Sequence, residues 1–498
     1  MWDNIEMKKF LSKYSLKYPR SLVYMLQASE YNIVEFLDWF RRVKDFAKVE
    51  ERKTLVKTIK ASLLYAIAWN LFILSFAIAI ASLWFFEGVR SLLVFLVIFL
   101  FAPYLTLYLL SLCTFLLNSV QRPIERIIIN KAKEKLQNHK ALKIGIAGSF
   151  GKTTMKEIIK TVLEGSKNVA ATPDNKNTPL GIARFVESLD GDEEILIFEM
   201  GEYYEGDIKK LCEIISPDIG VITGVNEAHL DKFKNIERTA KTIFELADFL
   251  SKKEGTKVYV NKESRSASES AAHIKNENKP FPKVIYYGHG GIEEGGGNWK
   301  VEGAETNLSG TSFILKNNKE EGVVVRSKLL GLHQIGPLAV ASHIAQSLGI
   351  KLEKIELGLK NTKPFKHRME PREDAGGVLV IDDSYNGNPD GVKVAIEFLK
   401  EIKDKRRFFI TPGLVEMGRK TEEVHREIGK ELANTGIEKV VLIRNSVTPF
   451  IEAGLKENNF KGEVIWFESS LECFSSLPKR TINNDLLLYQ NDWPDNYS

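Results

Sequence analysis

The sequence predicts an α/β protein with two ligand-binding units that follow a hairpin of two membrane-spanning helices. Three observations predict this fold class: two long uncharged runs near the N-terminus, short β-branched runs that alternate with helical stretches after Leu142, and a glycine-rich loop between a strand and a helix. With 498 residues, the chain has room for two to four domains of about 150 residues. Its 44% hydrophobic and 27% charged residues exclude a wholly disordered, collagen-like or coiled-coil chain.

Two apolar runs predict the membrane hairpin. Residues 61–86 and 91–120 contain no charged side chain, and only residues 87–90 separate them. At about 1.5 Å per residue, the shorter helix reaches roughly 39 Å, which exceeds the hydrocarbon core of about 30 Å. The alternative, a buried helix pair of a soluble protein, would need apolar residues on every face over an unusual length. We therefore expect two transmembrane helices, over 61–86 and 91–120.

The charges that flank the apolar runs predict how the hairpin is oriented. Residues 1–60 carry a net charge of +5 and residues 121–140 one of +4, whereas residues 141–498 carry −5. By the positive-inside rule, both ends of the hairpin face the cytoplasm and only the short link is translocated. We expect a two-pass protein of the cytoplasmic membrane, with a basic N-terminal segment over 1–60 and a juxtamembrane helix over 121–140. The basic excess indicates a lipid bilayer as partner and not a nucleic acid.

The sequence pattern of residues 141–362 predicts a parallel sheet. Apolar runs such as 195–198 and 218–222 alternate with helical stretches such as 154–164 and 236–250. This alternation is typical of a sheet that helices cover on both faces.

A change in composition marks a surface excursion and then a second unit. Residues 275–318 are rich in Gly, Lys, Glu and Asn, so we expect short strands there that bury little. After the Lys363-Pro364 break, residues 363–498 form a separate C-terminal domain, which looks like a compact nucleotide-binding fold. Its strands are expected to begin at Val378, Phe408, Val440 and Val464.

A phosphate-binding loop is predicted between the first strand and the first helix of the 141–362 region. Glycines there turn backbone N–H groups toward an anion, the helix N-terminus adds its dipole, Lys152 can reach phosphates, and Thr153 can ligate Mg²⁺. The general pattern asks for a further glycine where this chain has Ile146, so the pattern is not met in full. The alternative is a glycine-rich turn with an incidental lysine. The residues expected to bind the nucleotide are Gly148, Ser149, Gly151, Lys152, Thr153 and Thr154.

This loop resembles that of the Mur ligases, the ATP-dependent amide-forming enzymes of peptidoglycan assembly, which carry a shortened Gly-x-x-Gly-Lys-Thr form. Further motifs occur in the family's order and extend the likeness from Leu142 to the C-terminus. They look most like the MurF type, which adds D-alanyl-D-alanine to a UDP-linked muramoyl tripeptide. The resemblance implies a central ATP-binding Mur ligase domain and a Rossmann-like C-terminal Mur ligase domain. The motifs are Thr172-Pro-Asp-Asn175-Lys-Asn177, Glu199-Met-Gly201, Asn226-Glu-Ala-His229, His367-Arg368 and Asp382-Asp383-Ser-Tyr-Asn386-Gly-Asn388.

The resemblance implies a role for each of these residues. The catalytic residues are expected to be Lys152, Glu199 and His229, and the Mg²⁺ ligands Thr153, Glu199 and His229. The residues expected to bind ATP are Arg368, Asp382 and Asp383, and those expected to bind the substrates are Asn175, Asn177, Asn386 and Asn388. Taken singly, a solvated strand-end carboxylate, a surface histidine, an Asn-rich turn or a helix-capping acid pair explains these positions without a ligand.

Three features depart from the family pattern. The lysine that CO₂ carbamylates in the family aligns with Ile243, and the nearest lysine, Lys241, lies about 200° around the helix. Two amides that approach adenine in the family are replaced by Gln334 and Pro337. The first 140 residues hold the hairpin where MurF-type enzymes carry a UDP-binding domain.

The activity expected from the resemblance is that of a membrane-anchored, ATP-dependent and ADP-forming peptide ligase of cell-wall precursor synthesis. ATP phosphorylates the acceptor carboxylate, and an amine such as D-alanyl-D-alanine attacks the acyl phosphate. Two alternatives stay open. One keeps the chemistry but changes the acceptor to a polyglutamate or lipid-linked precursor, and the other is a nucleotide-binding scaffold with weakened catalysis.

Overall fold

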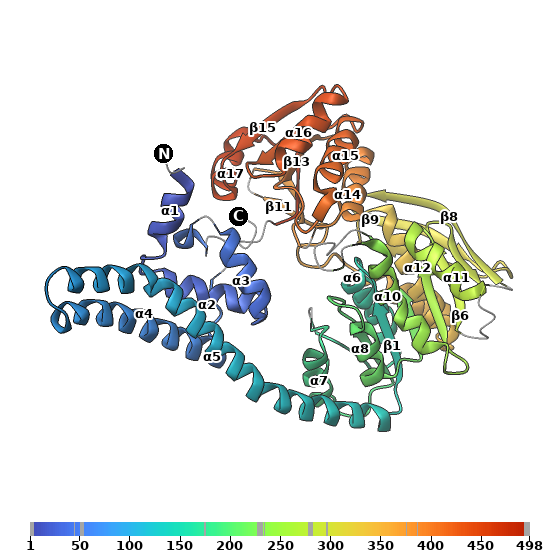
Figure 1. The fold of residues 1–498 in the computed structure, drawn as a ribbon. Coiled ribbons are helices and arrows are strands. Elements are labelled where there is room, and N and C mark those ends of the chain that lie inside the picture. Colours follow the sequence, from blue (N-terminus) through green and yellow to red (C-terminus); the bar gives the residue numbers. More distant parts are fainter. Residues whose placement is uncertain are drawn as a thin grey trace. The chain divides into compact units, whose positions relative to one another are not determined.

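The computed structural model describes residues 4–43, 45–49, 54–173, 176–226, 233, 235–276, 282–294, 297–374, 376–385 and 387–492. They form two compact units, one up to Ile127 and the other from Ile128 to Asp492. Figure 1 shows the elements of both units, coloured from blue at the N-terminus to red at the C-terminus. Each unit has a hydrophobic core of its own, so each is described by itself.

The first unit is built on two long helices. α4 (Ile59–Phe85) is capped by Thr58, whose side chain accepts a hydrogen bond from Ala61 N. α5 (Gly88–Asn138) follows after a two-residue link. The most apolar 18-residue windows of these helices have mean hydropathies of 2.2 and 2.5, and only 28% and 22% of each window is buried. Both helices are therefore long and apolar enough to cross a membrane, and most of their apolar surface is exposed.

Residues of the N-terminal segment fold onto this hairpin. Tyr18, Phe36 and Phe46 are fully buried in a core that they share with α4 and α5. The Tyr18 hydroxyl donates a hydrogen bond to Pro103 O at 2.9 Å, which ties the segment to α5. The segment is thus a small helical layer, which its basic composition did not predict. Its elements are α1 (Asn4–Ser12), α2 (Tyr18–Ala28), α3 (Ile33–Arg42) and the 3₁₀ helix η1 (Phe46–Lys48).

A ten-stranded sheet forms the middle of the second unit. Its strands are β1 (Leu142–Ala147), β2 (Val169–Ala171), β3 (Ile195–Glu199), β4 (Ile219–Ile222), β5 (Lys257–Asn261), β6 (Lys283–Gly288), β7 (Gly291–Glu294), β8 (Gly297–Asn307), β9 (Gly310–Lys316) and β10 (Gly322–Ser327). The strand order is β10-β9-β8-β7-β6-β5-β4-β1-β3-β2, and β1 to β6 pair in parallel. The loops that follow β1, β3 and β4 therefore meet at one edge of the sheet.

Helices cover both faces of this sheet, which confirms the predicted α/β class. On one face Ile158 and Leu338 pack against the strands, and on the other face Leu211 and Leu246 do so. The last turns of α5 add Leu136 to the second core. The first face carries α6 (Lys152–Glu164), α12 (Ile335–Ser347) and α13 (Leu352–Lys360), and the second face carries α7 (Pro179–Glu187), α8 (Asp207–Ile215), α10 (Ile236–Leu250) and α11 (Arg265–Asn276).

The predicted surface excursion is an antiparallel extension of the same sheet. β7, β8, β9 and β10 pair antiparallel one after another beyond β6. Trp299, Phe313 and Leu315 from these strands are buried in the core that also contains α12. The expectation that this segment buries little is therefore wrong, because one face of its strands packs against the helices.

A six-stranded sheet forms the C-terminal part of the second unit. Its strands are β11 (Glu370–Asp374), β12 (Val378–Asp383), β13 (Arg406–Thr411), β14 (Lys439–Ile443), β15 (Glu463–Phe467) and β16 (Asp485–Gln490). The order is β11-β12-β16-β13-β14-β15, and only β11 pairs antiparallel to its neighbour. The sequence pattern missed β11 and the central β16, which contains no β-branched side chain.

Helices lie on both faces of this second sheet as well. Leu399 and Leu432 contribute to the core on one face, and Cys473 and Leu477 to the core on the other. The first of these faces carries α14 (Pro389–Glu401), α15 (Thr421–Ala433) and α16 (Thr448–Glu457), and the second carries α17 (Ser470–Ser476) and η4 (Leu477–Arg480).

Two glycines set the close contact between α15 and α16. A Cβ at Gly429 would lie 2.2 Å from Ile451 O, and one at Gly454 would lie 2.2 Å from Arg426 O. Because both neighbours are backbone atoms, a side chain must push the helices apart. We expect Gly429→Ala to lower the free energy of unfolding by about 1–3 kcal/mol, the usual effect of overpacking. The midpoint of chemical unfolding measures this loss.

Gly165→Ala is the matched control for this substitution. Gly165 ends α6 with φ −71°, and no atom lies within 4 Å of the position of its Cβ. We expect its unfolding midpoint to stay unchanged. An equal loss in both variants would contradict the close-packing argument.

Candidate active site

The phosphate loop joins β1 to α6 at the edge where the parallel strands end. Gly148 has φ +144°, and a Cβ there would lie 2.2 Å from Thr223 Oγ1. Gly151 has φ +73° and stands at the N-cap of α6. Ser149 N donates a hydrogen bond to Gly224 O at 2.9 Å, which holds the loop against the end of β4. The loop is therefore a fixed turn that requires glycine at two positions and opens on a helix N-terminus.

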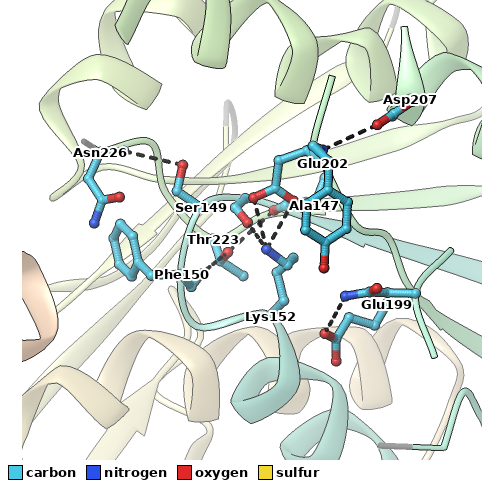
Figure 2. Close-up of polar contacts among 12 residues, drawn as sticks. Ala147, Ser149, Phe150, Lys152, Glu199, Glu202, Asp207, Thr223 and Asn226 are labelled. Atoms are coloured by element: carbon cyan, nitrogen blue, oxygen red, sulfur yellow. Dashed lines mark hydrogen bonds and ion pairs between the residues drawn. The ribbon is translucent and has the colours of Figure 1, made fainter. Parts of the chain in front are cut away.

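Lys152 lies in an anion-binding position at the start of α6, in the turn that also contains Thr153 and Thr154. Its Nζ is 3.0 and 2.9 Å from the two carboxylate oxygens of Glu202, and it also donates to Gly148 O. Figure 2 shows this ion pair beside the loop. The carboxylate of Glu202 stands in for an anionic ligand of the lysine, so the loop fits the phosphate groups of ATP.

Glu199 offers a buried carboxylate oxygen that no hydrogen bond satisfies. Glu199 is 3% exposed, and its Oε1 accepts a hydrogen bond from Asn177 Nδ2 at 3.2 Å. Lys156 Nζ lies 3.5 Å from Oε2, which has no hydrogen-bond partner in the described part of the chain. An anionic oxygen beside a phosphate loop that accepts no hydrogen bond from the described residues fits a hard cation such as Mg²⁺. Asn177, predicted to bind substrate, instead orients Glu199 in this structure.

A cleft of about 300 Å³ opens next to the phosphate loop. This volume falls at the lower end of the range of small-molecule sites. Residues of the ten-stranded sheet region line one side, and residues of the C-terminal part line the other. The predicted residues among them are Gly151, Thr154, Arg368, Asp383 and Asn388.

Arg368 and Asp383 bring opposite charges to the C-terminal side of the cleft. The Arg368 guanidinium lies over the ring of Tyr385, 4.9 Å from its centroid. Burial lowers the pKa of Arg368, and the nearby carboxylates of Glu199 and Asp383 oppose this shift. Burial raises the pKa of Asp383 to about 7, although Met369 N donates to the carboxylate at 3.2 Å. A cation over the cleft and a buried carboxyl group are thus placed for polar contacts with a nucleotide.

Asp382, the other member of the predicted acid pair, binds neighbouring side chains and does not line the cleft. Its carboxylate is 2.8 Å from His367 Nδ1 and accepts a hydrogen bond from Ser384 Oγ at 2.6 Å. Burial alone would raise the pKa of Asp382, but the hydrogen bonds from Ser384 and His367 hold it below its usual value. Asp382 is not among the residues that line the cleft, so the structure separates the two acids.

Asn388 connects the two parts of the site. Its Oδ1 accepts hydrogen bonds from Gly391 N, which caps α14, and from Asn226 Nδ2 at 2.9 Å. Asn226 follows β4, and its Nδ2 also donates to Asp390 Oδ2 at 2.8 Å. The loop after β4 therefore contacts the start of α14. The predicted residues Asn175, His229 and Asn386 lie outside the described residues.

The far end of the cleft carries two unpartnered polar atoms. Gln334 Nε2 lies 2.7 Å from His333 Nε2, while His333 Nδ1 and Gln334 Oε1 have no hydrogen-bond partner among the described residues. Burial lowers the pKa of His333 to about 4, so the ring is neutral near pH 7. Buried atoms of this kind fit the polar edge of a base. Gln334 thus keeps an amide at the cleft, and Pro337 lines it without one.

The position expected for a carbamylated lysine is part of the hydrophobic core. Ile243 is fully buried on α10 together with Leu246 and Ala247, whereas Lys241 is exposed. A local shift that would turn Lys241 inward is therefore absent from α10. The described part of this helix offers no lysine for the modification.

Sequence reasoning assigned no role to three polar residues of the site, although it quoted Asn226 within a motif. Glu202, Lys156 and Asn226 each contact a predicted residue, as the distances above show. Glu202 follows Glu199-Met-Gly201 directly, so its place on a loop at the sheet edge was a usable signal. Nothing in the spacing shows that its carboxylate turns toward Lys152.

The fold and the site define a class: an α/β nucleoside-triphosphate-dependent enzyme with a phosphate loop and a second, Rossmann-like domain. Residues 146–345 match the Mur ligase middle domain, and residues 367–489 match the Mur ligase, glutamate ligase domain. The chain belongs to the Mur ligase family. It is accordingly an ATP-dependent, ADP-forming peptide ligase that works with Mg²⁺.

Individual relatives agree with this assignment. The chain is 25% identical to the UDP-N-acetylmuramoyl-tripeptide–D-alanyl-D-alanine ligase of Bacillus subtilis over 360 residues. This alignment covers 72% of this chain and 75% of the relative. MurF from Acinetobacter baumannii superposes with a TM-score of 0.64 at 21% identity, covering 75% of this chain and 78% of that one. MurF from Thermotoga maritima in complex with ADP gives a TM-score of 0.62 at 24% identity, covering 74% and 80%. These structural matches show the fold.

The buried carboxyl of Asp383 predicts a pH effect on stability. Its pKa of about 7 in the folded protein lies above the value of about 3.9 in an unfolded chain. Between these values the folded state binds more protons, so stability falls as the pH rises from about 4 to 7. We expect Asp383→Asn to remove this part of the pH dependence, measured as chemical-unfolding midpoints of the nucleotide-free protein near pH 5 and pH 8.

Asp404→Asn serves as the control because Asp404 is exposed. It should keep the wild-type pH dependence. If Asp383→Asn also kept it, the burial of a protonated carboxyl at this position would be wrong.

Proposed function

We propose that this ligase joins D-alanyl-D-alanine, or a closely related amine, to the carboxylate of a muramoyl peptide, and that its hairpin anchors it in the cytoplasmic membrane. The observation that carries the proposal is the cleft that brings the phosphate loop together with Arg368 and Asp383, with Glu199 and its bare oxygen in electrostatic contact with Arg368. The relatives named above supply the substrate class.

The chemistry takes place in two steps. An oxygen of the acceptor carboxylate attacks the γ-phosphorus of ATP, and the bond to the bridging oxygen breaks to release ADP. The amine nitrogen then attacks the acyl carbon, loses a proton and displaces phosphate, which leaves the amide. Both steps develop negative charge on phosphate oxygens, so they need cationic groups placed in advance.

Lys152 and Arg368 supply these cationic groups from opposite sides of the site. Lys152 exchanges the Glu202 carboxylate for phosphate oxygens when the nucleotide binds. Arg368 lies over the ring of Tyr385, and the nearby carboxylate of Glu199 favours its charged form. Because the cleft has walls from both parts of the second unit, it can exclude water that would hydrolyse the acyl phosphate.

Glu199 and Thr153 would hold the Mg²⁺ ion, which neutralises phosphate charge during transfer. The Glu199 carboxylate is fixed by Asn177 and Lys156, and its Oε2 accepts no hydrogen bond from the residues that the structure describes, so this oxygen can serve as a ligand.

The hairpin gives the enzyme its place in the cell. α4 and α5 have the length and apolarity of membrane spans, and basic residues flank them on the sides of the N-terminus and the ligase region. This distribution favours two passes with both termini and the ligase domains in the cytoplasm. An acceptor linked to a lipid is the second candidate, because a helical membrane unit precedes the ligase domains.

Loss of Lys152 is expected to abolish ligation. Detergent-solubilised protein is incubated with Mg-ATP, UDP-muramoyl tripeptide and D-alanyl-D-alanine, and products are identified by mass spectrometry. We expect a pentapeptide product from the wild type and a rate lower by about a hundred-fold or more from Lys152→Ala, because a charged donor to the transferred phosphate is lost.

Lys241→Ala is the matched control, since Lys241 is exposed on α10. It should form product at the wild-type rate. Near-normal activity of Lys152→Ala would reject the phosphate site. Wild-type protein that hydrolyses or binds ATP but forms no pentapeptide would reject the UDP-linked acceptor and favour the lipid-linked one.

The two-pass topology predicts which side of the membrane each cysteine variant can be labelled from. In a Cys113→Ser background, Glu87→Cys at the hairpin link should react with a membrane-impermeant maleimide on intact cells. Lys430→Cys on α15 should react only after permeabilisation. The native Cys212 and Cys473 are buried and stay silent. Protection of Glu87→Cys in intact cells would show that the hairpin does not cross.

A further inference from the structure

The N-terminal helices pack against a part of the hairpin that a membrane would surround. We call the described residues of 4–49, with α1, α2, α3 and η1, the N-terminal layer (Figure 1). The Tyr14 hydroxyl of this layer donates a hydrogen bond to Leu100 O at 3.1 Å, and its ring stacks on Phe99 with the centroids 5.1 Å apart. Both partners lie inside the uncharged run over 91–120. The layer therefore touches α5 within its apolar run and not at its charged end.

The position of this contact along α5 gives its depth in a bilayer. α5 begins at Gly88, next to the hairpin link, and at about 1.5 Å per residue it reaches Leu100 after roughly 18 Å and Tyr104 after roughly 24 Å. The hydrocarbon core of a bilayer is about 30 Å thick. With the link at the far edge of this core, Leu100 and Tyr104 lie in the half that faces the cytoplasm.

Aromatic and cationic groups gather at the same level. Trp69 on α4 and Tyr104 on α5 both lie roughly 24 Å from the link, and such side chains are enriched where hydrocarbon meets headgroups. Lys13 Nζ donates to the Tyr104 hydroxyl at 2.5 Å and lies 4.3 Å from the centroid of its ring. A lysine is tolerated near this boundary better than at the centre of the bilayer. The level at which the layer meets the hairpin thus has the composition of a membrane interface.

The outer surface of the N-terminal layer is apolar and basic. The apolar side chains of Met7, Leu11 and Leu16 are 49%, 60% and 74% exposed. Met7 and Leu11 lie about one turn apart on α1, so they share a face. The exposed charged residues described in the layer are the basic Lys8, Lys17, Arg20, Arg41 and Arg42 and the acidic Glu30 and Asp38. Apolar groups for acyl chains and a basic excess for anionic headgroups characterise a helix that lies in the membrane interface.

We propose that the N-terminal layer is part of the membrane anchor and lies in the cytoplasmic leaflet. The face of Met7 and Leu11 contacts acyl chains, and the basic side chains contact anionic headgroups. Lipid would then cover this face together with the exposed apolar surface of α4 and α5 beside it. This inference rests on the insertion of the hairpin in the proposed function and is independent of the acceptor and the amine.

The depth of a nitroxide label on α1 tests the proposal. Full-length Cys113→Ser protein with Leu11→Cys is labelled and reconstituted into vesicles of phosphatidylethanolamine and phosphatidylglycerol. Electron paramagnetic resonance measures the collisions of the label with oxygen, which concentrates among acyl chains, and with a polar nickel chelate, which stays in water. We expect the ratio of oxygen to nickel collisions to exceed that of Lys430→Cys on α15 by about ten-fold. It should approach the ratio of Leu96→Cys, an exposed position in the apolar run of α5.

A charge on the apolar face provides a second readout. Leu16→Asp should lower the ratio measured at Leu11→Cys toward the aqueous value, because a carboxylate is expelled from acyl chains. Leu357→Asp is the matched control, since Leu357 is a 52% exposed leucine on α13 of the ligase region, and it should leave the ratio unchanged. Neither leucine is buried, so both variants keep the hydrophobic cores.

The reference labels separate this inference from the anchoring itself. Lipid values at Leu96→Cys and Leu11→Cys, with a fall caused by Leu16→Asp alone, support the proposal. A lipid value at Leu96→Cys with an aqueous value at Leu11→Cys would overturn it and leave the hairpin anchored. Aqueous values at both would reject the membrane anchor of the proposed function as well. A label at Leu11→Cys that is shielded from oxygen and nickel alike would show a protein contact on this face and also contradict the proposal.

Discussion

The balance of charge at the phosphate loop is the constraint on which the rest of the site depends. Lys152 and Glu202 form one nearly buried ion pair, and Lys156 with Glu199 forms another. Burying charges without partners is expensive, and each pair is arranged so that an incoming nucleotide and cation can exchange partners with it. The groups that we propose to bind the ligand are thus the same groups that neutralise one another in its absence.

The parallel sheet is what brings these charges together. The chain reaches Lys152 at the start of α6 after β1, Glu199 at the end of β3 with Glu202 just beyond it, and Asn226 after β4, and all of them lie at one edge of the sheet. Parallel pairing places the carboxyl ends of neighbouring strands at the same edge of the sheet. Residues that follow different strands therefore come together there. From this edge Asn226 reaches Asn388 at the start of α14, so the same edge also positions the C-terminal side of the cleft. The convergence of both parts at the cleft therefore follows from one topological feature.

Much of this could be predicted from the sequence, because local chemistry determines it. The glycine turn before Lys152, the strand that ends at Glu199 and the apolar hairpin each have a signal within a few residues. The rest depends on contacts between distant segments. Glu202 contacts Lys152 across a sequence separation of 50 residues, and β16 lies inside its sheet without a β-branched residue. The helix α2 is buried by contacts with the hairpin, α3 and η1 together. Residues 275–318 were judged by composition, whereas the alternating side chains of the strands within that range determine their burial.

The departures from the family pattern leave this machinery intact, which argues against a scaffold without catalysis. Ile243 lies within a hydrophobic core, so the absence of a lysine there costs no packing and leaves no empty polar site. Gln334 still presents an amide oxygen to the cleft, and the neutral ring of His333 lies beside it. Meanwhile Glu199 keeps a bare buried oxygen and Lys152 a displaceable anion. Among the described residues the Glu199 oxygen has an ion-pair contact with Lys156 but no hydrogen bond, so it retains acceptor capacity that a hard cation can use.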